Sequence, residues 1–212
     1  MDVDEAQARM QEIQRIMERA TLFTLLPGMS AILGGILVLA GCAASYAMFR
    51  SLDFADILRL SLSSQAAFCV MWFLIGVVAL LLEVVLTARA ARKEQLVPAH
   101  RPMRVAAFSL TPSVLVAVVL TFKFLIPLEP RAEEIQYIVP VWMMLYGTGV
   151  YTAGLFSIRP PRVLGLVFLA TGVVALLGFP EYGVVSAALS FGLLHVIFGV
   201  YVVRKQRQTV VA

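Results

Sequence analysis

MWFLIGVVALLLEVVLTARAAR, residues Met71 to Arg92, is the stretch of this sequence that decides its fold. An apolar run of this length forms a helix that crosses a hydrocarbon core of about 30 Å. The run ends at Arg89 and Arg92, and a basic end of this kind is typical of the cytoplasmic face. It also holds one carboxylate, Glu83, and an ionisable group inside a membrane span is a functional hypothesis by default.

Composition places the whole chain in the same class. Of its 212 residues 60% are hydrophobic and 14% charged, with a mean hydropathy of +0.89. Soluble domains have about 45–50% apolar and about 25% charged residues. The net charge of +4 does not indicate nucleic acid, because the basic residues flank apolar runs and form no single patch. We therefore expect the lipid bilayer as the main partner and no nucleic-acid partner.

The hydropathy pattern predicts an all-α, polytopic membrane bundle of six helices. The spans are expected at about 27–49, 62–88, 103–126, 137–158, 163–178 and 184–203. They form one transmembrane domain over residues 27–203. Residues 1–26 precede it as an amphipathic helix with a juxtamembrane lead-in, and residues 204–212 follow as a basic cytoplasmic tail.

The N-terminal segment 2–20 predicts an amphipathic helix, cytosolic or interfacial. Glu5 and Arg9 stand four apart, in the order that favours a helical ion pair. Its apolar stripe consists of Val3, Ala6, Met10, Ile13, Met17 and Ala20. One hypothesis is a helix that binds a cytosolic protein or a second copy of the chain. The other, which the shortness of the stripe favours, is a helix packed on the bundle or lying at the membrane surface.

The distribution of basic residues predicts the orientation. With a cytoplasmic N-terminus, thirteen of the seventeen Lys and Arg residues lie in cytoplasmic segments. They are Arg9, Arg15, Arg19, Arg89, Arg92, Lys93, Arg101, Arg104, Arg159, Arg162, Arg204, Lys205 and Arg207. We expect a bacterial inner-membrane protein with both termini inside.

Polar side chains in four spans are predicted to share one layer in the cytoplasmic half. Depth is counted from the nearest basic residue at about 1.5 Å per residue. It is about 9 Å for Glu83, 14 Å for His195, 10 Å for Thr111 and 12 Å for Tyr151. Ser109, Thr152 and Ser30 are further candidates for this layer.

Two hypotheses explain this layer. In the first, Glu83 and His195 line a ligand-binding or proton-responsive pocket that faces the cytoplasm. In the second, Glu83 hydrogen-bonds a neighbouring hydroxyl and only ties helices together. Pro112, inside the third span, frees a backbone carbonyl and predicts a hinge or a static kink. No catalytic group, metal site or cofactor is predicted.

Two resemblances bear on function. Gly147-Thr148-Gly149 and His195-xxx-Gly199 are faintly similar to rhomboid intramembrane proteases, but Thr148 stands where their serine nucleophile would be. More broadly, Leu145-Tyr146-Gly147 and Leu194-His195 resemble a group of uncharacterised bacterial six-span membrane proteins with a polar amphipathic N-terminus. This second resemblance implies the six-span fold and no activity.

We expect a non-enzymatic, small transport-type or regulatory membrane component. The alternative is a scaffold or sensor subunit that binds a cytosolic partner through residues 2–20. A membrane-embedded enzyme ranks third, because no nucleophile pair, metal cluster or phosphate-binding motif is present in the sequence.

Overall fold

The computed structural model describes residues 5, 7, 9, 10, 28–93, 101–125, 132–155 and 159–211, and no strand occurs among them. The elements are α2 (Gly28–Phe49), η1 (Phe54–Arg59), α3 (Leu62–Lys93), α4 (Arg101–Leu125), α5 (Ala132–Ile135), α6 (Ile138–Leu155), α7 (Arg159–Gly178), α8 (Gly183–Ala187), η2 (Ala188–Leu194) and α9 (His195–Val211). Six segments are long and apolar enough to cross a membrane. The predicted all-α class and the six membrane-length helices are confirmed.

Three helices extend four or more residues beyond the predicted crossings, and one of them is α7, which begins at Arg159 where about 163 was predicted. The 32 residues of α3 correspond to about 48 Å, more than a hydrocarbon core needs. Helix α9 continues through Arg204, Lys205 and Arg207, which the sequence assigned to a tail. Lys, Arg and Gln are good helix formers, so the winding need not stop where the apolar run stops.

Most of the predicted helix 2–20 lies outside the described residues. Glu5, Gln7, Arg9 and Met10 are described, and all four are helical. Arg9 Nη2 lies 2.7 Å from Glu5 Oε1, as the four-residue spacing predicts. Both side chains are exposed, so this pair contributes little to stability.

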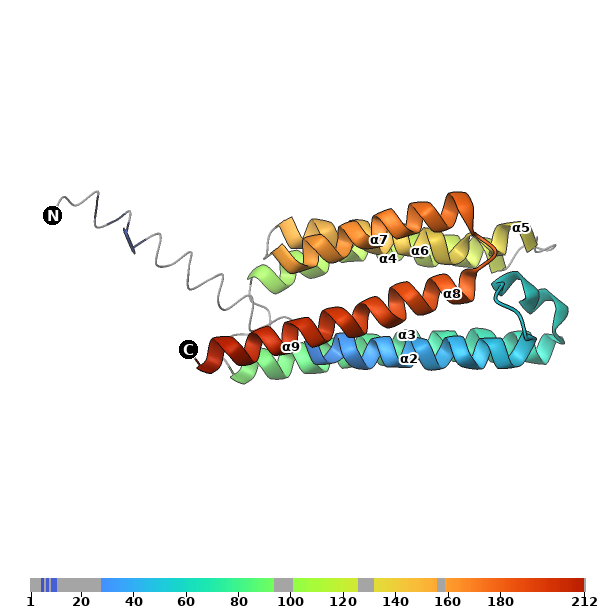
Figure 1. The fold of residues 1–212 in the computed structure, drawn as a ribbon, viewed down its shortest axis with the longest axis horizontal. Helices are drawn as coiled ribbons and strands as arrows, with labels where there is room; N and C mark the ends of the chain where they lie inside the picture. The colour runs from blue at the N-terminus through green and yellow to red at the C-terminus, as the bar shows by residue number, and fades with distance from the viewer. Residues whose placement is uncertain are drawn as a thin grey trace.

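The six long helices form two groups joined by an oblique one. Helices α4, α6 and α7 pack together on one side, and α2 and α3 on the other (Figure 1). The continuous segment α8–η2–α9 runs between them, contacting α6 near its start and α2 along its length. Helices α4 and α7 both pack on α6, and α3 and α9 both pack on α2. Thus α2 and α6 are the central helices of the two groups.

Glycines set the register between α2 and α9. A Cβ built on Gly199 would lie 2.5 Å from the carbonyl oxygen of Gly28, and one on Gly35 would lie 2.6 Å from that of Gly192. In each helix the two glycines stand seven residues apart, about two turns, so both contacts lie on one antiparallel seam. Inside a bilayer, helices associate mainly through such close packing.

Helices α6 and α7 approach equally closely. A Cβ on Gly165 would lie 2.5 Å from the backbone nitrogen of Tyr151. At the end of the pair, Arg162 Nε donates to the carbonyl of Gly154 at 2.6 Å, and Nη2 donates to that of Leu155 at 3.2 Å. The guanidinium therefore satisfies carbonyls that the end of α6 leaves open. Arg159 to Arg162 form the first turn of α7, so this contact holds the start of α7 against the end of α6.

Each group also contains a tryptophan bonded to a hydroxyl. Trp72 Nε1 donates to Ser45 Oγ at 3.1 Å, and this hydroxyl donates to the carbonyl of Gly41. Trp142 Nε1 donates to Thr121 Oγ1 at 2.7 Å, which donates to the carbonyl of Ala117. The same arrangement thus joins α3 to α2 and α6 to α4.

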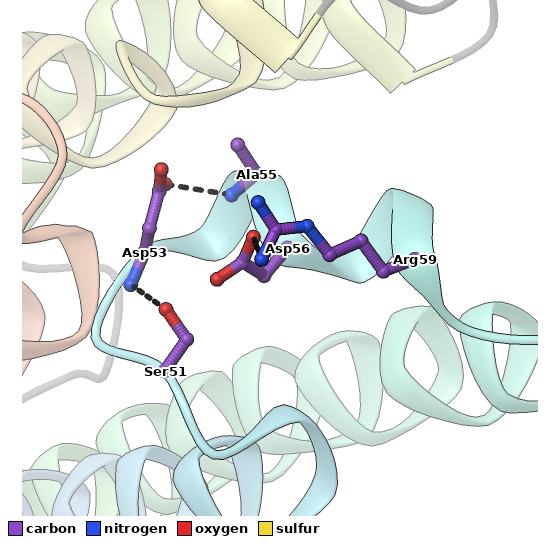
Figure 2. Close-up of polar contacts among 5 residues, drawn as sticks. All are labelled: Ser51, Asp53, Ala55, Asp56 and Arg59. Atoms are coloured by element: carbon purple, nitrogen blue, oxygen red, sulfur yellow. Dashed lines mark hydrogen bonds and ion pairs between the residues drawn. The ribbon is translucent and has the colours of Figure 1, made fainter.

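The connection between α2 and α3 is held by local polar contacts (Figure 2). Asp53 accepts a hydrogen bond from the backbone nitrogen of Ala55 at 2.8 Å and so caps η1, while its own nitrogen donates to Ser51 Oγ. Arg59 pairs with Asp56 at 3.0 Å. A backbone bond of 2.9 Å from the nitrogen of Val184 to the carbonyl of Leu52 then ties this connection to α8.

We predict that Gly199→Ala lowers stability by about 1–3 kcal/mol, because its methyl group meets the α2 backbone, which cannot move aside as a side chain can. Gly76→Ala is the control, since a Cβ there has no atom within 4 Å. The measurement is reversible unfolding of purified protein in mixed micelles. Equal losses for both variants would contradict the proposed role of the α2–α9 seam.

A second prediction concerns pH. Burial raises the pKa of Asp53 above its ordinary 3.8, an effect that the Ala55 amide opposes and the nearby Asp56 and Glu181 reinforce. A raised pKa in the fold favours the protonated form. Stability is therefore highest below the ordinary value and falls as the pH rises through the folded one.

We expect the thermal unfolding midpoint in non-ionic detergent to fall between about pH 4 and about pH 7, and Asp53→Asn to remove part of that fall. Glu133→Gln, which changes an exposed carboxylate of α5, is the matched control and should keep the wild-type slope. An unchanged slope in Asp53→Asn would show that this carboxyl does not set the pH dependence.

Candidate functional site

Glu83 lies at the interface of α3 and α2. Ser30 Oγ, from the first turn of α2, donates to Glu83 Oε2 at 2.5 Å, and Thr87 Oγ1 lies 3.4 Å from Oε1. Ser30 is only 4% exposed. A carboxyl group turned toward lipid would be costly, and these contacts instead hold it between two helices.

His195 bonds a tyrosine on the other helix group. Its Nε2 lies 2.8 Å from the Tyr146 hydroxyl, so the contact joins α9 to α6. Its Nδ1 lies 3.4 Å from the carbonyl oxygen of Ser190. Because a carbonyl only accepts, Nδ1 is the donor there, and in the neutral ring Nε2 then accepts from Tyr146. In the protonated ring both nitrogens donate, so the tyrosine hydroxyl must reverse its role.

Aromatic rings surround this pair. The Tyr146 ring centre lies 5.0 Å from that of Phe168 and 5.4 Å from that of Phe191, and Phe191 stacks on the imidazole of His195. Phe168, from α7, is fully buried. These rings bring α6, α7, η2 and α9 to one point and fix the orientation of the imidazole.

A π-helical segment, η2, directly precedes His195. In such a helix each backbone N–H bonds the carbonyl five residues earlier. The side chain of His195 also reaches a carbonyl five residues earlier, because its Nδ1 lies 3.4 Å from the carbonyl oxygen of Ser190. Such segments are rare and are frequent at functional sites. The hydrophobic pattern cannot reveal one, because a single change of winding leaves the run of apolar residues intact.

Glu83 and His195 do not bond each other in the described part of the chain. Each instead bonds a hydroxyl from a neighbouring helix. The described structure thus has two polar contacts, Ser30–Glu83 between α2 and α3 and Tyr146–His195 between α6 and α9.

The sequence named Tyr151 for this layer, whereas Tyr146 is the tyrosine that bonds His195. Five residues correspond to about 140° around a helix, so the two tyrosines face different ways. Tyr151 lies where α6 meets Gly165 of α7. Depth counted from Arg159 puts Tyr146 about 20 Å deep, deeper than the predicted layer. Helix α9 runs obliquely between the two groups (Figure 1), and His195 at its start bonds Tyr146 of α6.

The remaining predicted residues lie on α4 and α6. Thr152 Oγ1 donates within its own helix, to the carbonyl of Thr148 at 2.8 Å. On α4, Ser109 is partly buried and Thr111 is exposed. Pro112 does not end α4, which continues as one helix on both sides of it. A role for Ser109, Thr111 or Thr152 in the pocket, and a hinge at Pro112, stay predictions.

Among the described residues, no group of three or more His, Cys, Asp and Glu side chains is arranged to hold a metal ion. Comparison with protein families, curated proteins and solved structures found no match to this chain. The chemistry that the site itself allows is exchange and sharing of protons between a carboxyl, a phenol and an imidazole.

We predict an energetic coupling of about 0.5–1.5 kcal/mol between Tyr146 and His195, from the hydrogen bond that joins them. The test is a double-mutant cycle with Tyr146→Phe and His195→Phe, which keep a ring at each position and remove the polar atoms. Unfolding free energies of the four proteins give the coupling. As a matched control, Tyr146→Phe is combined with Thr171→Val, whose hydroxyl bonds within α7. That pair should be additive, and additivity in the first cycle would contradict the bond.

Proposed function

We propose that this protein is a proton-responsive, non-enzymatic membrane component of the transport type, with the polar layer around Glu83 and His195 as its working site. The observation that carries this proposal is the pair of interhelical bonds, Ser30–Glu83 and Tyr146–His195. Each joins a titratable side chain inside an apolar span to a hydroxyl on another helix. Intramembrane ionisable residues of this kind commonly mark proton or substrate paths.

Protonation would act on helix packing through these bonds. A charged Glu83 only accepts hydrogen bonds, whereas a protonated one can also donate. Protonation of His195 reverses the required role of the Tyr146 hydroxyl, which lies between α6 and α9. Proton binding would thereby change the contact between the two helix groups, and two such packings are what a transport-type cycle requires.

The orientation that we propose has both termini in the cytoplasm of a bacterial cell, with the protein in the inner membrane. It is supported by the antiparallel packing, which gathers the end of α3, the end of α6, the start of α7 and the end of α9 at one end of the bundle (Figure 1). The described basic residues at that end include Arg89, Arg92, Arg159, Arg162 and Arg204. The positive-inside rule assigns such an end to the cytoplasm.

The test combines infrared spectroscopy with proton flux in proteoliposomes. We expect wild-type protein to show the carbonyl band of a protonated carboxyl group that titrates with pH, and Glu83→Gln to lack it. Glu181→Gln, which changes an exposed carboxylate in the turn before α8, should keep the band. Under an imposed membrane potential, wild-type vesicles should take up protons, and Glu83→Gln vesicles should fall to the level of protein-free ones.

Two results would overturn the proposal. A titrating band that survives in Glu83→Gln would show that another group binds the proton. Wild-type vesicles no more permeable than protein-free ones would remove the transport role. That second result would favour the hypothesis in which Glu83 only ties helices together and residues 2–20 bind a cytosolic partner.

A further inference from the structure

A shallow groove of about 490 Å³ lies on the surface of α9, beginning directly after His195 and extending toward the C-terminal end. The lining residues in the described part of the chain come from three turns of α9. They are Val196, Ile197, Val200, Tyr201, Arg204, Lys205 and Gln208. The groove is apolar at one end and basic at the other, which is the polarity of a phospholipid.

The apolar part of the groove has the length of one membrane leaflet. Eight residues separate Val196 from Arg204, which is about 12 Å along a helix, and half of a hydrocarbon core is about 15 Å. Ile197 and Tyr201 are about half exposed, at 55% and 50%. Tyrosine at this position, one turn before the charges, is typical of the boundary between acyl chains and headgroups.

The charged end of the groove suits an anion. Arg204 and Lys205 both line it and both are exposed. The sequence contains no acidic residue after Glu181, so the charges on this end of α9 are all basic. A guanidinium beside an ammonium group matches a phosphate that carries a net negative headgroup charge.

Helix α9 continues to Val211, past the level at which Val202 and Val203 meet Gly28 of α2. Arg204 and Lys205, at the charged end of the groove, follow directly after that level.

From this shape, length and charge we propose that the groove binds one anionic phospholipid of the leaflet next to the C-terminus. One acyl chain lies along Val196 and Val200, and the phosphate contacts Arg204 and Lys205. The proposed lipid binding does not depend on the function proposed for the proton-responsive layer.

The test is native mass spectrometry of the full chain released from nanodiscs of mixed phosphatidylglycerol and phosphatidylcholine. We expect one phosphatidylglycerol retained per chain. Arg204→Gln should weaken its retention about five-fold, the effect of one basic residue near an anionic headgroup. Val200→Phe should also reduce retention, by filling the groove. The matched control is Arg159→Gln, an exposed arginine of α7 at the same end of the bundle, which should leave retention unchanged.

Three results would overturn the inference. Equal retention of phosphatidylcholine would show that the groove does not select lipids by the net charge of the headgroup. Equal losses in Arg204→Gln and Arg159→Gln would indicate general attraction to the basic end of the bundle. A dimer mass that Val200→Phe abolishes would assign the groove to a second copy of the chain.

Discussion

The close approach of α2 and α9 is the constraint on which the rest of this structure depends. Inside a bilayer, lipid tails are as apolar as leucine, so burying apolar surface between helices gives little driving force. Backbone contact at Gly28–Gly199 and Gly35–Gly192 supplies packing instead. Helix α9 packs on α2 through these glycines. Its His195 side chain lies toward the other helix group, where it bonds Tyr146.

The polar layer follows from the same geometry. Ser30 is two residues from Gly28 in the first turn of α2, and it is the serine that reaches Glu83 on α3. One interhelical bond thus joins α2 to α3 and the other joins α9 to α6, and the glycine seam between α2 and α9 links the two. The carboxyl and the imidazole do not bond each other; that they share one depth stays a prediction.

Sequence reasoning recovered what depends on local composition. The six helices follow from apolar length alone, and Glu83 and His195 stood out because titratable residues are rare in such runs. Counting depth along the helices also made Ser30 a candidate for the layer. It did not identify Tyr146, because a depth counted along one helix ignores the tilt of the neighbouring helix. The partners of Trp72 and Trp142 also required knowledge of which helices are adjacent.

The π-helical segment makes the two ends of this arrangement interdependent. Gly192 lies inside it and faces α2, whereas His195 follows it and faces α6. If the segment returned to ordinary α-helical winding, residues on one side of it would turn by about 100° relative to the other. The chain could then keep the glycine seam or the tyrosine contact, but not both. The wider winding of η2 therefore couples the packing of Gly192 on α2 to the orientation of the His195 side chain toward Tyr146.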